Sequence, residues 1–261
     1  MFSNFIADKE SNEAYGIMCA SFDAVSGAEK VSGGGETELN IEKTPRSGAF
    51  HITSQPYSSP LSFTFQVINY DGTNIDETKE RSIKKWLCKR GKYIDFQIDD
   101  DRFDNVKFQV NISNPQIIKV GDVVGMEFSV QCKFPYGYSP TLNKLYNIST
   151  INQQITLFIN NDDDDYIFPD VIITSNINGS LSITNSTDVA NRIFTISNLV
   201  VGEVITIKGS IPDISSSVSS HAVWTDFNKR WIRFTDGTNI LTVSNLCTIK
   251  LSYQEPRKVG I

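Results

Sequence analysis

The residues of this chain that most often do chemistry, its histidines, are not arranged for catalysis. The two histidines, His51 and His221, lie in different halves of the sequence. Neither has a nearby serine, cysteine or aspartate in the pattern of a catalytic triad, so we expect both to be surface or loop histidines. The paired carboxylates of a glycoside hydrolase cannot be recognised from sequence spacing. We predict no catalytic residues and a protein that is not an enzyme.

Two acidic runs have the residue type that binds hard cations. They are Asp99–Asp101, with Asp104 close by, and Asp162–Asp165. Asp99–Asp101 lacks the spacing of a calcium-binding loop. The four adjacent carboxylates of Asp162–Asp165, in a flexible turn, usually repel one another and stay solvated. We expect polar turns here, and we predict no metal site and no cofactor.

The glycine and cysteine patterns also argue against common binding motifs. Three consecutive glycines end the segment 26–35, but no Gly-Lys-Ser/Thr and no helix pattern follow, so a phosphate loop is disfavoured. A flexible or strongly bent segment is expected instead. No two cysteines form a CxxC pair, which favours buried free thiols in a reducing compartment. The cysteines are Cys19, Cys88, Cys132 and Cys247.

Trp224 and Trp231, with Phe227 between them, are the candidate glycan-stacking residues. Flat aromatic rings stack on the apolar faces of sugar rings, so a pair of exposed tryptophans can form a carbohydrate platform. Packing of at least one of them into the core is the competing interpretation.

The elements that would position these residues are mostly strands. Alternating apolar residues predict a half-buried strand over 61–69 and a long strand over 126–132. Between them, Ile83, Trp86 and Leu87 form one apolar stripe at helical spacing, in a helix expected to begin near Asp76 and stop at Gly91. Its C-terminal half is basic, with Lys84, Lys85, Lys89 and Arg90. A solvated helix face, a subunit contact and nucleic-acid binding are the alternatives for this cluster.

A long exposed hairpin is predicted over 38–53, around the turn residues 45–49. It contains few large apolar residues, so it cannot rest on a core of its own. Another subunit is a plausible support for it. Its candidate contact residues are Leu39, Ile41, Phe50 and Ile52.

The chain is expected to form two domains, 1–143 and 144–261, because prolines and glycines over 135–140 interrupt the pattern. The fold class is mostly β, with one covering α-helix in the first domain. The second half has short strands and polar turns as in a β-sandwich, no helical period, and a polar tail from Gln254.

Bulk properties suit a soluble globular protein. Of its 261 residues, 39% are hydrophobic and 21% are charged. The net charge of −6 argues against nucleic acid as the main partner, since phosphate binding needs a basic surface. No apolar run approaches the ~18 residues of a membrane span, and the start lacks the pattern of a signal peptide.

The order and spacing of these elements resemble the distal tail protein (Dit) family of long-tailed phages. The resemblance spans nearly the whole chain, and each motif is loose by itself. In the first half it rests on 63–67, 81–87, 93–101 and 126–132 running into Pro135-Tyr136. In the second half it rests on Asn160 with 169–173, 234–240 and 247–253.

This resemblance implies a structural role in the virion. The first domain would be a ring-forming β-sandwich in which six copies enclose a channel for DNA, and the hairpin 38–53 would be an arm that reaches the neighbour. The second would be a galectin-like β-sandwich. Expected partners are the tail tube protein, a tail-associated lysin or tail fibre hub, and receptor-binding proteins, at the distal end of a tail made in the bacterial cytoplasm. The alternative is a lectin-like module that recognises host cell-wall glycans.

Overall fold

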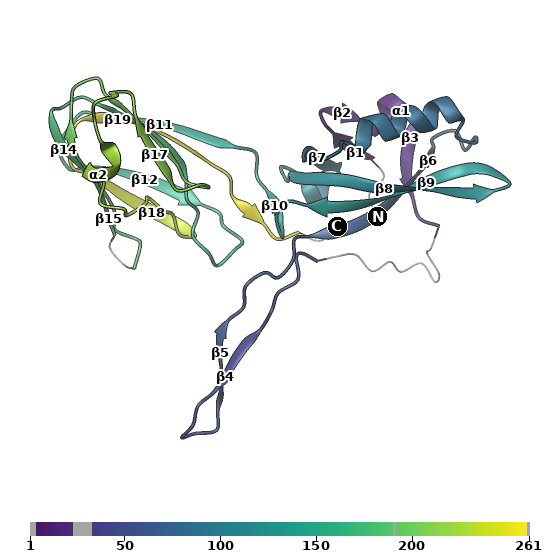
Figure 1. The fold of residues 1–261 in the computed structure, drawn as a ribbon, viewed down its shortest axis with the longest axis horizontal. Helices are drawn as coiled ribbons and strands as arrows, with labels where there is room; N and C mark the ends of the chain where they lie inside the picture. Colours follow the sequence, from purple (N-terminus) through teal and green to yellow (C-terminus); the bar gives the residue numbers. More distant parts are fainter. Residues whose placement is uncertain (1–3, 23–32, 190–191, 260–261) are drawn as a thin grey trace. The chain divides into compact units, whose positions relative to one another are not determined.

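The chain folds into two compact units in a computed structural model that describes residues 4–22, 33–189 and 192–259 (Figure 1). The first unit comprises Met1–Tyr138 and Arg257–Ile261, and the second comprises Ser139–Pro256. Each unit has its own cluster of buried apolar side chains. The mostly β fold class predicted from the sequence is confirmed.

One seven-stranded antiparallel sheet forms the body of the first unit, in the order β2-β1-β7-β8-β9-β6-β3. Its strands are β1 (Asn4–Ala7), β2 (Glu10–Ser11), β3 (Ile17–Ala20), β6 (Ser62–Asn69), β7 (Ile94–Asp99), β8 (Phe108–Val120) and β9 (Asp122–Cys132). Short 3-10 turns η1 (Asn12–Tyr15) and η2 (Asp101–Phe103) connect some of them. A separate hairpin pairs β4 (Asn40–Lys43) with β5 (Phe50–Ser54).

The sheet of the first unit curls around its core. Phe5 of β1 and Phe65 of β6 have β7, β8 and β9 between their strands in the sheet order, yet their ring centroids are 5.3 Å apart. Phe5 also stacks on Trp86 at 5.7 Å. Inward-facing aromatic side chains therefore close the sheet and the helix over one buried cluster, as the alternating apolar pattern predicts.

The one long helix in the described part of the chain, α1 (Glu77–Leu87), buries its predicted apolar stripe. It begins as expected, because Asp76 Oδ1 accepts a hydrogen bond from the Lys79 backbone N–H at 2.8 Å. The predicted stop at Gly91 is wrong, since the helix ends at Leu87. The turn after it is held by Asn111, whose side-chain amide donates to the carbonyls of Lys89 and Lys92 at 3.2 and 2.8 Å.

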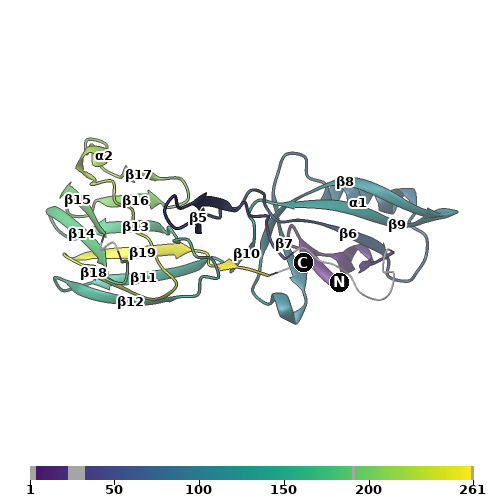
Figure 2. The same cartoon turned by 90° about the horizontal axis from the view of Figure 1, so that it is seen from below.

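Two sheets face each other in the second unit, and Figure 2 shows their strands in the orders β11-β19-β13-β16-β17 and β12-β18-β14-β15. The first sheet contains β11 (Leu142–Ile148), β13 (Asp170–Ser175), β16 (Val204–Lys208), β17 (Asp213–Ser216) and β19 (Cys247–Tyr253). The second contains β12 (Gln153–Ile159), β14 (Gly179–Asn185), β15 (Ile193–Leu199) and β18 (Gly237–Val243). Two further short strands, β10 (Gly137–Tyr138) and β20 (Pro256–Arg257), form a separate two-stranded sheet.

Several local predictions for the second half are wrong. A one-turn helix, α2 (Val223–Asp226), interrupts the strands, because four residues are too few to show a helical period. Residues 231–234 form no regular strand, and Phe234 pairs with Ile167 as an isolated bridge. The predicted polar tail includes β20, and Val259 packs against the core of the first unit.

Candidate functional site

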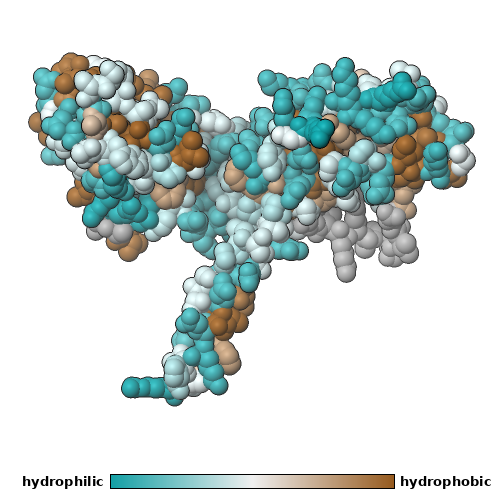
Figure 3. Space-filling view, viewed as in Figure 1, coloured by the Kyte–Doolittle hydropathy of each residue, from teal (hydrophilic) through white to brown (hydrophobic). Residues whose placement is uncertain are grey.

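The hairpin β4–β5 exposes apolar side chains along its length, and Figure 1 shows it standing away from the other strands of its unit. The exposed fractions are 46% for Leu39, 50% for Ile41, 71% for Phe50 and 65% for Ile52. Ile41 is directly opposite Ile52, and Phe50 lies two residues from Ile52, so these three share one face. Apolar side chains gather on this part of the surface in Figure 3.

The base of the hairpin is fixed to the first unit. Gly35 N–H donates to the Pro135 carbonyl at 2.7 Å. Thr37 and Tyr57, on the two segments that lead into and out of the hairpin, form an isolated antiparallel β-bridge. A Cβ at Gly35 would lie 2.4 Å from Pro135 Cβ, so only glycine allows this approach. Residues 26–32 of the predicted flexible segment lie outside the described residues. The apolar face is therefore carried on an anchored element.

The aromatic residues proposed for glycan stacking do come together, around the end of α2. The ring of Trp224 lies 6.2 Å from that of Trp231, and Phe227 contacts Trp231 edge-to-face at 4.9 Å. Trp224 is 51% exposed, whereas Phe227 is buried and Trp231 packs against the core. Lys229 Nζ lies 4.6 Å from the Trp224 ring and donates to the Trp224 carbonyl. This ammonium occupies part of the surface that a sugar would need.

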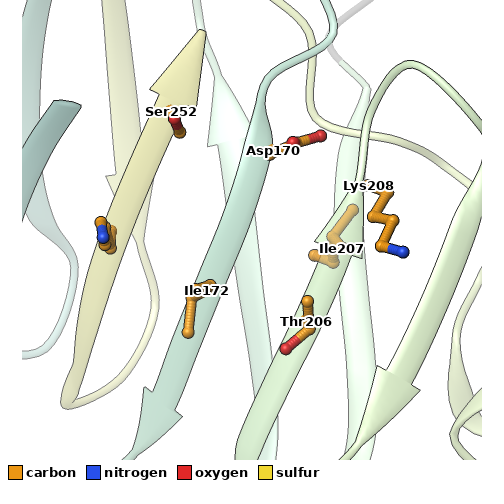
Figure 4. A pocket seen from close by; sticks show the side chains of 7 residues that line it. Asp170, Ile172, Thr206, Ile207, Lys208 and Ser252 are labelled. Carbon is orange, nitrogen blue, oxygen red and sulfur yellow. The ribbon is translucent and has the colours of Figure 1, made fainter. Parts of the chain in front are cut away.

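A shallow cavity of about 250 Å³ lies on the outer face of β13, β16 and β19 (Figure 4). Lys208 and Lys250 supply positive charge, and Asp170, held by Gly209 N–H at 2.8 Å, supplies negative charge. None of its lining residues is aromatic. The cavity lacks the stacking surface that carbohydrate recognition uses.

His221 lies in the loop before α2, and this loop histidine has two acidic neighbours. Its side chain is only 7% exposed, and Nδ1 lies 2.5 Å from Glu203 Oε1 while Nε2 lies 3.1 Å from Asp226 Oδ2. Ser216 Oγ donates to the same Glu203 oxygen at 2.5 Å, so the serine is bonded to the carboxylate rather than to the histidine. The group therefore lacks the serine–histidine bond of a catalytic triad.

The acidic runs show no arrangement for a cation. Within 4–22, 33–189 and 192–259, no group of three or more His, Cys, Asp or Glu side chains is placed to hold a metal ion. His51 lies on β5 and is exposed. No helix among the described residues is long and apolar enough to cross a membrane.

All four cysteines are free, as predicted, and Cys19, Cys132 and Cys247 are buried. Burial raises the pKa of each of these three thiols to about 12. They are therefore protonated and unreactive at neutral pH.

Two family models match the sequence. One, described as a phage tail protein N-terminal domain, matches residues 1–133, and the other, a phage tail C-terminal domain, matches residues 136–253. No curated protein matches the chain.

The fold is similar to that of a solved phage protein. The crystal structure of Dit (gp 19.1) from phage SPP1, described as a paradigm of the hub adsorption apparatus in phages that infect Gram-positive bacteria, aligns with a TM-score of 0.67. Sequence identity is 10%, and the alignment covers 97% of this chain and 99% of that chain. The resemblance to the Dit fold is confirmed, and the two matching domain models show that the chain belongs to a family of phage tail proteins.

Proposed function

We propose that this protein is a distal tail hub, in which six copies close into a ring through their first units and leave a channel for DNA. The ring joins the tail tube to the tail-tip and receptor-binding apparatus. The Dit-like fold supports this role, and the observation that carries it is the exposed apolar face of the β4–β5 hairpin.

A hairpin with these side chains needs a partner. A two-stranded hairpin alone is marginally stable in water, yet Ile41, Phe50 and Ile52 are each at least half exposed on one face. Covering a half-exposed large apolar side chain contributes about 1 kcal/mol. When a neighbouring copy covers this face, each covered side chain adds this amount to the free energy of association. The ring repeats the contact at every subunit.

The proposed partners beyond the ring are the tail tube protein, a tail-associated lysin or tail fibre hub, and receptor-binding proteins. Assembly begins in the bacterial cytoplasm, which agrees with four free cysteines. The location is the distal end of the virion tail.

The test replaces Phe50 and Ile52 with serine in one chain and measures its mass in solution by light scattering. The proposal expects this variant to lose the ring, because the apolar contact is removed. The matched control replaces Leu145 and Phe158 of the second unit, which are 66% and 73% exposed, with serine. We expect this control variant to form the ring. Rings that survive the hairpin substitutions unchanged argue against the arm.

Glycan recognition by the second unit is the alternative, and it has weaker support. Trp224 is exposed, but Lys229 lies over its ring, and Trp231 is used for packing. A galectin-like fold does not by itself carry sugar binding.

A further inference from the structure

We propose that the two oppositely charged ends of β7 are the complementary halves of one contact between neighbouring copies in the ring. The basic end of one copy would receive the acidic end of the next. This inference rests on the proposed hub function and names a contact within it.

The basic end lies between α1 and β7. Lys85, Arg90 and Lys92 are exposed there, and none of them makes an ion pair with any residue that the structure describes. Lys89 adds a further charge, and its only described pair is a long contact of 3.9 Å from its Nζ to Asp8 Oδ2. By contrast, Lys84 and Arg81 pair with glutamates within the helix. The unpaired cations thus collect at the end of the helix.

The acidic end follows β7, around η2. Asp100 caps η2 and binds Arg102, with Nε and Oδ1 3.1 Å apart. The hydrogen bonds from Arg102 hold the pKa of Asp100 below its ordinary value. Asp99, Asp101 and Asp104 are exposed and make no ion pair among residues 4–22, 33–189 and 192–259. Three carboxylates are therefore available to a partner.

The strand between them sets their separation and direction. β7 has six residues, which at ~3.3 Å per residue spans about 20 Å. It is held on both sides, with Phe96 opposite Ala7 of β1 and Phe108 of β8. The two clusters consequently sit at fixed, opposite ends of a rigid element.

This polarity disfavours any contact that matches an end with its own kind. A two-fold contact that matched either end with itself would place like charges together, which is unfavourable. A head-to-tail contact places the basic end against the acidic end, and repetition of a head-to-tail contact generates a ring when the rotation closes. The charge pattern therefore requires that unlike ends meet, and the ring of the proposed hub function makes that contact head-to-tail.

The basic end also contains a surface cavity. A cavity of about 310 Å³ lies there, with Lys85 and Lys89 among its lining residues and Asp8 and Glu10 beside them. The Tyr15 ring stacks on Trp86 at 4.1 Å, which makes this wall rigid. In η2 of a neighbouring copy, the exposed Asp101 carries the charge opposite to that of the two lysines.

The test reverses the charge of each end of β7 in a separate variant. One chain carries Lys85→Glu, Arg90→Glu and Lys92→Glu, and a second carries Asp99→Lys, Asp101→Lys and Asp104→Lys. Each alone should need at least a tenfold higher concentration than wild type to form rings, as measured by light scattering and negative-stain microscopy. An equimolar mixture of the two should form rings, because every contact then joins opposite charges. A chain with all six changes should also recover the ring.

The wild-type chain reports on the hub function itself, and the reversed chains report on this contact. If the wild-type chain forms rings and each charge-reversed chain forms them at the same concentration, the proposed contact is wrong. The hub function is unaffected by that result. Folded reversed chains that fail to assemble when mixed would also overturn it, with far-UV circular dichroism and thermal unfolding as the check on folding. If both charge-reversed chains misfold, ring formation by the wild-type chain is compared in about 0.05 M and 1 M salt. Salt screens charges, so the higher concentration should weaken a contact between charged ends. Ring formation that is the same at both salt concentrations would contradict the proposed contact.

Discussion

At the scale of single residues, Glu203 is a buried carboxylate that its neighbours keep charged. Burial opposes the charged form, but hydrogen bonds from Ser216, His221 and the Val200 N–H outweigh it and hold the pKa of Glu203 below its ordinary value. The hydrogen bond to Glu203 in turn raises the pKa of His221 against the opposing effect of burial, and Asp226 adds to the rise. The two residues tie β17 and α2 to the turn before β16.

Replacing His221 with alanine should therefore destabilise the second unit in a pH-dependent way. The raised pKa means that the protonated histidine stabilises the fold fully below its ordinary value of 6.5, and that this contribution is lost as pH rises through the folded-state value. We expect a loss of about 1–3 kcal/mol near pH 5.5, from a buried carboxylate that loses a partner, and a smaller loss near pH 8.5. Thermal unfolding of both proteins at the two pH values measures it. Equal losses at both would contradict the charged pair.

The sequence could not predict this network, because its members are brought together by the sheet. Glu203 precedes β16 and Ser216 ends β17, and the antiparallel register of these strands places them side by side. No local spacing around His221 carries that information. The tryptophan pair was predictable, since Trp224 and Trp231 are close in sequence, but the position of Lys229 over Trp224 was not.

At the scale of elements, the hairpin depends on its glycine base. Alanine at Gly35 would place its Cβ 2.4 Å from Pro135 Cβ and 2.5 Å from the Ser59 carbonyl oxygen, so backbone must move. A Cβ at Gly33 meets nothing within 4 Å, which makes Gly33→Ala the matched control. We expect Gly35→Ala to cost about 1–3 kcal/mol of unfolding free energy and Gly33→Ala to cost much less. Urea unfolding compares them, and equal stabilities would refute the close approach.

Elements with a strong period were predictable, and weakly patterned ones were not. The stripe of Ile83, Trp86 and Leu87 and the Asp76 cap identify α1 from sequence alone. β11 was missed because only one of its seven residues is fully buried, as expected for the edge strand of its sheet. The turn that follows α1 is held by Asn111, which is 22 residues beyond Lys89. Boundaries set by distant residues leave no trace in the local sequence.

At the scale of the whole molecule, the two units have separate tasks in the proposed hub. The first carries both features that we assign to ring contacts, the apolar face of β4–β5 and the charged ends of β7. The apolar face supplies most of the contact free energy, since exposed ion pairs contribute only about 0–1 kcal/mol each. The charged ends disfavour orientations that bring like charges together. The second unit is a β-sandwich with its own core, free to meet the remaining tail proteins.

The most direct test of the hub is the state of the purified full chain. Light scattering after size-exclusion chromatography should give a mass close to six times the 29.2 kDa of one chain, and negative-stain microscopy should show six-fold rings with a central opening. A species that stays at the mass of one chain at the highest attainable concentration would contradict the account.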